Sequence, residues 1–174
     1  MNILTGVTAP APPPTNPLLN TEFNSLSKWK ISDTTRVSVT NNDGLSGNNA
    51  LKIALAGNAT NSFIFQESQN SQNIGYGRKF HLHLRKGSTY TLTFMAKAEK
   101  PGAIIKAKFE KANEGDTVYW TSEPIAVETT KKEYKATYTH KGDDVQDMRL
   151  TISFEGSNNT VYFDKVVLKS TRDN

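Results

Sequence analysis

The stretch Tyr90-Thr91-Leu92-Thr93-Phe94-Met95-Ala96-Lys97-Ala98 places an apolar side chain at every second position. Successive side chains of a β-strand point to opposite faces, so this period of two predicts a strand with one face in a hydrophobic core. Two later stretches show the same pattern. In these, the residues expected to share a buried side are Ile105, Ala107 and Phe109, and then Met148, Leu150, Ile152 and Phe154.

Short stretches of this kind begin at residue 18 and are separated by Gly, Asn, Asp and Lys-Gly clusters typical of turns. No apolar pattern with the 3.6-residue period of a helix persists through a long segment. We therefore predict an all-β fold built as a two-sheet antiparallel β-sandwich. The expected strands are 18–23, 29–32, 36–40, 50–55, 62–66, 79–84, 88–99, 104–111, 117–120, 125–127, 132–140, 148–155 and 160–168.

The length of 174 residues fits one globular domain preceded by an arm. Residues 1–17 are rich in proline, which favours an extended conformation, and we interpret them as an N-terminal arm or linker. Residues 18–170 are expected to form the sandwich, and 171–174 a tail. The arm is either a tether or a segment that docks on a partner subunit.

Composition excludes several classes of function. The chain has no cysteine, which excludes disulfides, thiolate metal sites and cysteine nucleophiles. Its net charge of +4 comes from basic residues scattered among acids, so we expect no nucleic-acid partner, although an acidic polysaccharide would be attracted. No apolar run is long enough to cross a bilayer, and the N-terminus shows no signal peptide. We expect no membrane partner and a location outside the cell or on a virion or cell surface.

Four motifs occur in a fixed order along the chain. They are Leu18-Leu19-Asn20-Thr21-Glu22-Phe23-Asn24 followed by Trp29, then Gly47-Asn48-Asn49-Ala50-Leu51-Lys52-Ile53, then residues 86–98, and finally residues 159–168. Together they resemble the jelly-roll carbohydrate-binding modules of the group that includes families 4, 9, 16 and 22. The resemblance implies a jelly-roll sandwich that binds a polysaccharide or cell-surface glycan without catalysis. Binding would use aromatic stacking and polar contacts on a concave sheet face.

Phe63 and Gln66 are the first candidate contacts, because modules of this group commonly use an aromatic residue near a glutamine in this strand. Phe63 and Phe65 lie on one side of the strand, with Ile64 and Gln66 on the other. If Ile64 is in the core, Phe63 faces outward and Gln66 points inward unless the strand is bulged. A core position for Phe63 is the alternative.

Tyr119 and Trp120 are the second candidate, as a stacking platform for a sugar ring. Adjacent side chains on a regular strand point to opposite faces, so one of the two is expected outside. The alternative is that Trp120 closes the edge of the sandwich. Trp29 is expected in the core.

Polar contacts are expected from Tyr76 and Arg78, in a Gly-bracketed polar loop, and from Arg149. The loop residues are alternatively part of a solvated hairpin. His81 and His83 share a strand face, but no third metal ligand accompanies them, so we interpret them as surface histidines.

A structural calcium ion is implied by the resemblance alone. Modules of this group often bind calcium through backbone carbonyls, a carboxylate soon after the opening Phe, and an Asp in the last strand. Asp164 matches the last of these, and Asn24 stands where the first acid is expected, which lowers the charge of the site. Asp164 alternatively caps backbone amides or pairs with a lysine.

We expect no catalytic residues. The acidic residues lie mostly in turns and form no evident pair for glycoside hydrolysis, and no nucleophile, phosphate-loop or zinc-protease motif is present. The alternative function is structural or adhesive, such as a phage virion accessory or decoration protein whose N-terminal arm docks on a partner subunit.

Overall fold

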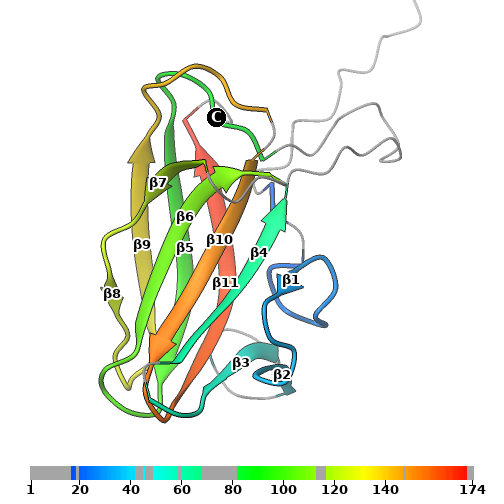
Figure 1. The fold of residues 1–174 in the computed structure, drawn as a ribbon, viewed down its shortest axis with the longest axis vertical. Helices are drawn as coiled ribbons and strands as arrows, with labels where there is room; N and C mark the ends of the chain where they lie inside the picture. Colours follow the sequence, from blue (N-terminus) through cyan, green and yellow to red (C-terminus); the bar gives the residue numbers. More distant parts are fainter. Residues whose placement is uncertain are drawn as a thin grey trace, which may run out of the picture.

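The computed structural model describes residues 17–18, 20–41, 45, 49–58, 60–67, 82–112, 117–146 and 148–171. They form two antiparallel sheets stacked face to face, without a helix in these ranges (Figure 1). The prediction of an all-β, two-sheet antiparallel sandwich is confirmed. No helix in the described part of the chain is long and apolar enough to span a membrane.

One sheet has six strands and lies toward the viewer in Figure 1. Its order is β1-β4-β10-β6-β7, and β8 pairs with the same strand β6. The bounds are β1 Lys30–Ile31, β4 Thr60–Glu67, β6 Ile104–Lys111, β7 Val118–Thr121, β8 Ile125–Ala126 and β10 Met148–Gly156.

The second sheet has five strands in the order β2-β3-β11-β5-β9. The last strand of the chain, β11, lies in the middle of this sheet, between β3 and β5. The bounds are β2 Val37–Asn41, β3 Asn49–Leu55, β5 Thr89–Ala98, β9 Lys132–Thr139 and β11 Asn159–Ser170.

The core lies between the sheets and is built from the alternating apolar positions. In β5, β6 and β10 the buried apolar residues are those expected from the sequence. Aromatic rings join the two layers: the Phe163 ring centroid on β11 lies 5.2 Å from that of Phe154 on β10 and 5.0 Å from that of Phe94 on β5. Trp29 is buried, as expected, and contacts Phe23.

Two expected strands are wrong within the described residues. Residues 20–23 contain a turn instead of a strand, because Asn20 and Phe23 have φ angles of 50° and 47°, in the left-handed region that interrupts an extended strand. In segment 79–84, only residues 82–84 are described, and these contribute a single bridge between Leu84 and Val145.

Candidate functional site

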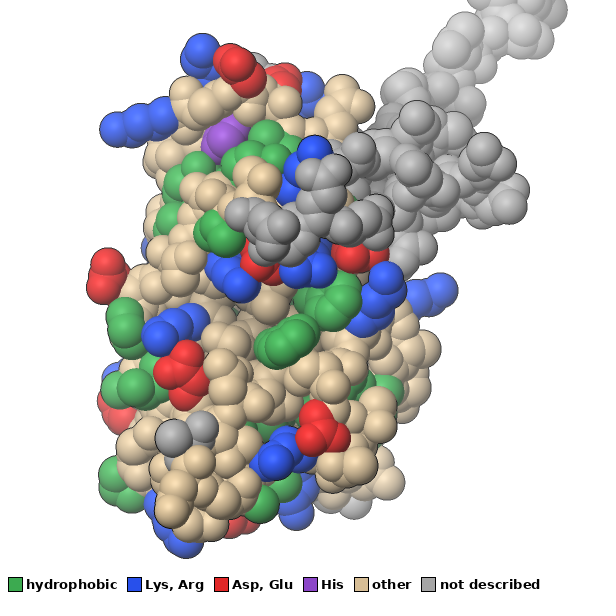
Figure 2. All heavy atoms as spheres, in the orientation of Figure 1, with side chains coloured by type: hydrophobic (Ala, Val, Ile, Leu, Met, Phe, Trp, Pro, Cys, Tyr) green, Lys and Arg blue, Asp and Glu red, His purple; other side chains and the backbone are tan. Residues whose placement is uncertain are grey.

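A shallow groove crosses the outer face of the six-stranded sheet. The register places Phe63 of β4 opposite Ser153 of β10, which in turn lies opposite Lys106 of β6. On this face, hydrophobic side chains lie among basic and acidic ones (Figure 2). The groove encloses about 430 Å³ and is lined by Asn61, Phe63, Lys106, Ala107, Lys108, Glu110, Val118, Thr121, Arg149, Thr151, Ser153 and Glu155.

Phe63 faces this groove because its neighbour Ile64 is fully buried in the core. The Phe63 side chain is 39% exposed. Its ring centroid lies 6.3 Å from that of Phe65, the next outward residue of the strand. The arrangement with Phe63 outside is therefore the observed one, and the core alternative is wrong.

Gln66 does not reach the groove. β4 pairs with β10 without a register shift, so its alternation turns Gln66 inward with Ile64. There Gln66 is buried, and its Nε2 donates to the Lys28 carbonyl at 3.3 Å. The expectation that Gln66 lies beside Phe63 on a ligand-binding face is wrong, because one strand cannot present both residues to the same side without a bulge.

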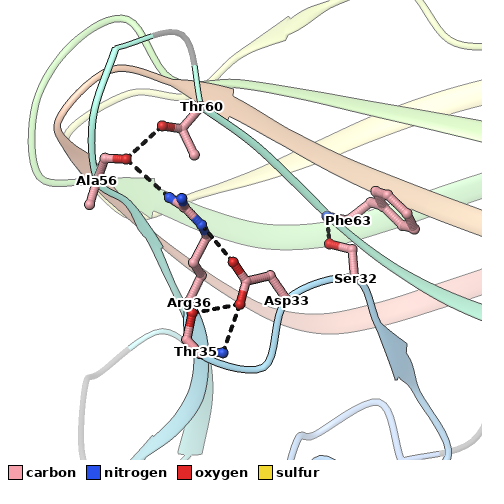
Figure 3. A network of polar contacts seen from close by, with 7 residues as sticks. All are labelled: Ser32, Asp33, Thr35, Arg36, Ala56, Thr60 and Phe63. Carbon is pink, nitrogen blue, oxygen red and sulfur yellow. Dashed lines mark hydrogen bonds and ion pairs between the residues drawn. The ribbon is translucent and has the colours of Figure 1, made fainter.

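Ser32 holds the backbone of Phe63 at the edge of the sheet. The Phe63 amide donates to the Ser32 Oγ at 3.0 Å (Figure 3). The Ser32 amide donates to the Phe63 carbonyl, also at 3.0 Å. β1 ends at Ile31, one residue before Ser32, so these two bonds extend the pairing between β1 and β4 beyond the end of the short strand.

The loop that carries Ser32 is itself fixed by Asp33. Its carboxylate accepts hydrogen bonds from the Thr35 hydroxyl and amide and from the Arg36 Nε. These bonds lower the pKa of Asp33. Arg36 then donates to the Ala56 carbonyl, which also accepts from the Thr60 hydroxyl at the start of β4 (Figure 3). The network ties the loop to the connection between β3 and β4 that leads into Phe63.

Glu110 is a buried carboxylate at one end of the groove. Lys108 Nζ lies 2.6 Å from its Oε1, while Arg149 Nε and Thr151 Oγ1 donate to its Oε2 at 2.9 Å and 2.8 Å. Burial opposes ionisation, but the hydrogen bonds from Lys108, Thr151 and Arg149 outweigh it and lower the pKa of Glu110. The carboxylate is therefore ionised at neutral pH.

Arg149 lines the groove, and its role as a polar contact to a glycan stays a prediction. Its guanidinium carbon lies 4.8 Å from the Phe65 ring centroid, and the Lys30 ammonium lies 5.5 Å from the same centroid. The sequence did not single out Lys106, Lys108, Glu110 or Val118 for this face. The alternation of the groove strands contains that information once β4, β10, β6 and β7 are known to be neighbours.

Tyr119 and Trp120 do not line the groove. Trp120 lies opposite Phe109, whose side chain is in the core, and stacks on Tyr138 of the other sheet with centroids 5.4 Å apart. Tyr119 packs edge-on against His140. Burial raises the pKa of Tyr138 in this cluster.

A β-bulge between β6 and β7 explains why neither aromatic residue lines the groove. The register between β6 and β7 shifts between Phe109 and Glu110, and such a shift lets adjacent side chains depart from strict alternation. Both aromatic residues are half-buried and pack against the core, while Val118 and Thr121 line the groove. The alternative in which Trp120 closes the sandwich edge is the observed one.

Tyr76, Arg78 and His81 lie outside the described residues, as do residues 1–16 of the arm. His83 is described, and its Nε2 accepts a hydrogen bond from the Arg85 Nε at 3.1 Å.

The two calcium candidates differ in their surroundings. Asp164 is fully buried at the bulge of β11, whereas Asn24 is exposed and its Oδ1 accepts a hydrogen bond from Asn49 at 2.9 Å. The described residues contain no group of three or more His, Asp or Glu side chains placed to hold a metal ion. A hard cation needs six to eight oxygen ligands, so these side chains alone fit calcium poorly. Calcium binding stays a prediction.

Several solved structures with the same architecture are carbohydrate-binding modules. A family 61 module in complex with β-1,4-galactotriose superposes with a TM-score of 0.62 at 18% identity, over 88% of this chain and 97% of that one. A family 16 module gives 0.60 at 17% identity, over 88% and 99%. The fold is that of the jelly-roll carbohydrate-binding modules. The resemblance to this group that the sequence predicted is therefore confirmed for the fold.

The same jelly roll also occurs outside free-standing modules. The enzymatically active domain of bacteriophage CBA120 tailspike protein 4 gives a TM-score of 0.60 at 14% identity, over 89% of this chain but 21% of that one. No protein-family model matches the sequence, and no curated protein matches it. Fold similarity at this level of identity does not establish the function of the chain.

Proposed function

We propose that this chain binds a polysaccharide or cell-surface glycan, without catalysis, in the groove on the six-stranded sheet. The observation that carries the proposal is the position of Phe63 and Val118. They are the large hydrophobic side chains left exposed among the described residues, and both line this groove. An exposed aromatic ring beside polar side chains is the surface that a sugar ring requires.

The groove has the length and polarity for a short stretch of glycan. Phe63 and Val118 lie on β4 and β7, three strand spacings apart, which corresponds to about 14 Å. Hydroxyl, ammonium and carboxylate groups of β10 and β6 lie between them, including Ser153, Lys106 and Glu155. A sugar at either apolar end would thus have polar partners toward the centre.

Native affinity electrophoresis against neutral and acidic polysaccharides, with calcium and with chelator, tests the proposal. We expect retardation by at least one polysaccharide, and a clear reduction of that retardation in Phe63→Ala. The matched control is Tyr162→Ala, which removes an aromatic ring from the outer face of the other sheet. If the folded wild-type protein is retarded by none of the polysaccharides, the proposal is wrong.

A structural or adhesive role is the second candidate, and the similarity to a tailspike chain favours it. In this role the sandwich would be an accessory or decoration domain on a virion or cell surface, and the N-terminal arm would dock on a protein partner. Sizing chromatography of the full chain and of a chain starting at residue 18 tests this idea. A self-associated full chain and a monomeric shortened chain would support docking of the arm on a second copy.

A further inference from the structure

The ion pairs on the groove face present their cations to the surface. In three of the four pairs among the described residues of this face, the basic side chain is much more exposed than the acidic one. The pairs and the exposed fractions of base and acid are Lys30–Glu67, 64% and 16%; Lys108–Glu110, 37% and 1%; Arg149–Glu110, 20% and 1%; and Lys106–Glu155, 34% and 33%. A ligand on this face therefore meets positive charge first.

Glu110 fixes two of these cations from below. Both of its oxygens are occupied, one by Lys108 and the other by Arg149 and Thr151, and the side chain is almost wholly covered. Its acceptor sites are therefore used within the protein rather than offered to a ligand. The negative charge holds Lys108 and Arg149 in place without facing the groove.

The Arg149 guanidinium is held on two sides. Its Nε donates to Glu110, and the group lies over the Phe65 ring. The described residues provide no hydrogen-bond acceptor for the two Nη atoms of Arg149, whose side chain lines the groove. A fixed, planar guanidinium whose Nη groups have no acceptor among the described residues matches the two oxygens of a carboxylate.

We infer that the ligand of the groove is an acidic glycan, in which a sugar carboxylate pairs with Arg149 and Lys108 while a ring packs on Phe63. The inference rests on the proposed function, since it names the class of glycan for the same groove. The net charge of +4 adds general attraction for such a polymer.

Affinity electrophoresis with polygalacturonate and alginate as acidic probes, and galactan and xylan as neutral ones, tests the inference. We expect retardation by at least one acidic probe. Arg149→Lys keeps the charge but loses the planar pair of donors, and should weaken that binding about tenfold. Lys135→Gln removes an exposed cation from β9 of the other sheet and should change the binding less than twofold.

The following outcomes would overturn the inference. Retardation by neutral probes only would overturn the acidic ligand while leaving glycan binding intact, whereas retardation by no probe would remove both. Equal weakening by Arg149→Gln and Lys135→Gln would show that only overall charge matters, and would also overturn the inference. If urea unfolding shows that changes at Arg149 disturb the fold, Lys108→Gln replaces them, and unchanged acidic binding in that variant would contradict the inference.

Discussion

Phe63 is an aromatic residue left exposed on a strand whose other side is fully buried. Phe63→Ala should therefore leave the free energy of unfolding within about 0.5 kcal/mol of the wild-type value. Loss of ring stacking should nevertheless weaken glycan binding by roughly 1 kcal/mol, or about fivefold. Urea unfolding and affinity electrophoresis of the same preparation check the two values. A large loss of stability with unchanged affinity would assign Phe63 to the fold instead.

Glu110 should make the free energy of unfolding depend on pH. Its folded-state pKa is lowered below the ordinary value of 4.5, so its stabilising effect is complete above that pH and is lost as the pH falls through the folded-state value. Glu110→Gln should lower the free energy of unfolding by about 1–3 kcal/mol at pH 7. The difference from wild type should shrink below about pH 4. Urea unfolding at pH 7, 5 and 3 measures it, and a difference independent of pH would contradict the assignment.

The edge of the six-stranded sheet depends on the loop that follows β1. Ser32→Ala removes the side-chain acceptor of the Phe63 amide while leaving the bond from the Ser32 amide to the Phe63 carbonyl. We expect the Phe63 amide to exchange with solvent roughly fivefold faster, corresponding to about 1 kcal/mol. Hydrogen exchange followed by NMR gives this rate. The Ile152 amide, in the central strand β10, serves as the control and should be unaffected.

Strand β7 contributes Trp120 to the packing between the two sheets. Because Trp120 packs between Phe109 and Tyr138, Trp120→Ala should lower the free energy of unfolding by about 2–3 kcal/mol, near the lower end for buried aromatic residues. Thr121→Ala, which changes a groove residue of the same strand, should cost much less. Urea unfolding compares the two variants. A stable Trp120→Ala protein that no longer binds glycan would restore Trp120 as a platform.

The last strand of the chain occupies the middle of the five-stranded sheet. β11 is paired on both sides, with β3 and with β5, and supplies Phe163 to the shared core. A chain ending at residue 158 should therefore fail to fold, whereas a chain ending at residue 171 should give the wild-type spectrum. NMR amide dispersion distinguishes the two cases. A dispersed spectrum from the shorter chain would show that β11 is dispensable.

Local sequence determined much of this protein. The alternation in β5, β6 and β10 identified the strands and their buried sides, because a strand with one wet face must repeat every two residues. The same rule limited Phe63 and Gln66 to opposite sides of β4. It left open which of the two sides was buried.

Tertiary structure decided the rest. Packing against the other sheet turned Ile64 and Gln66 inward, and left-handed residues at Asn20 and Phe23 replaced an expected strand by a turn. The bulge opposite Glu110 drew Tyr119 and Trp120 toward the core. The groove arises where β4, β10 and the consecutive pair β6 and β7, which lie far apart in the sequence, become neighbours. Local periodicity contains no information about such pairing, because strand order depends on contacts between the sheets rather than on any one segment.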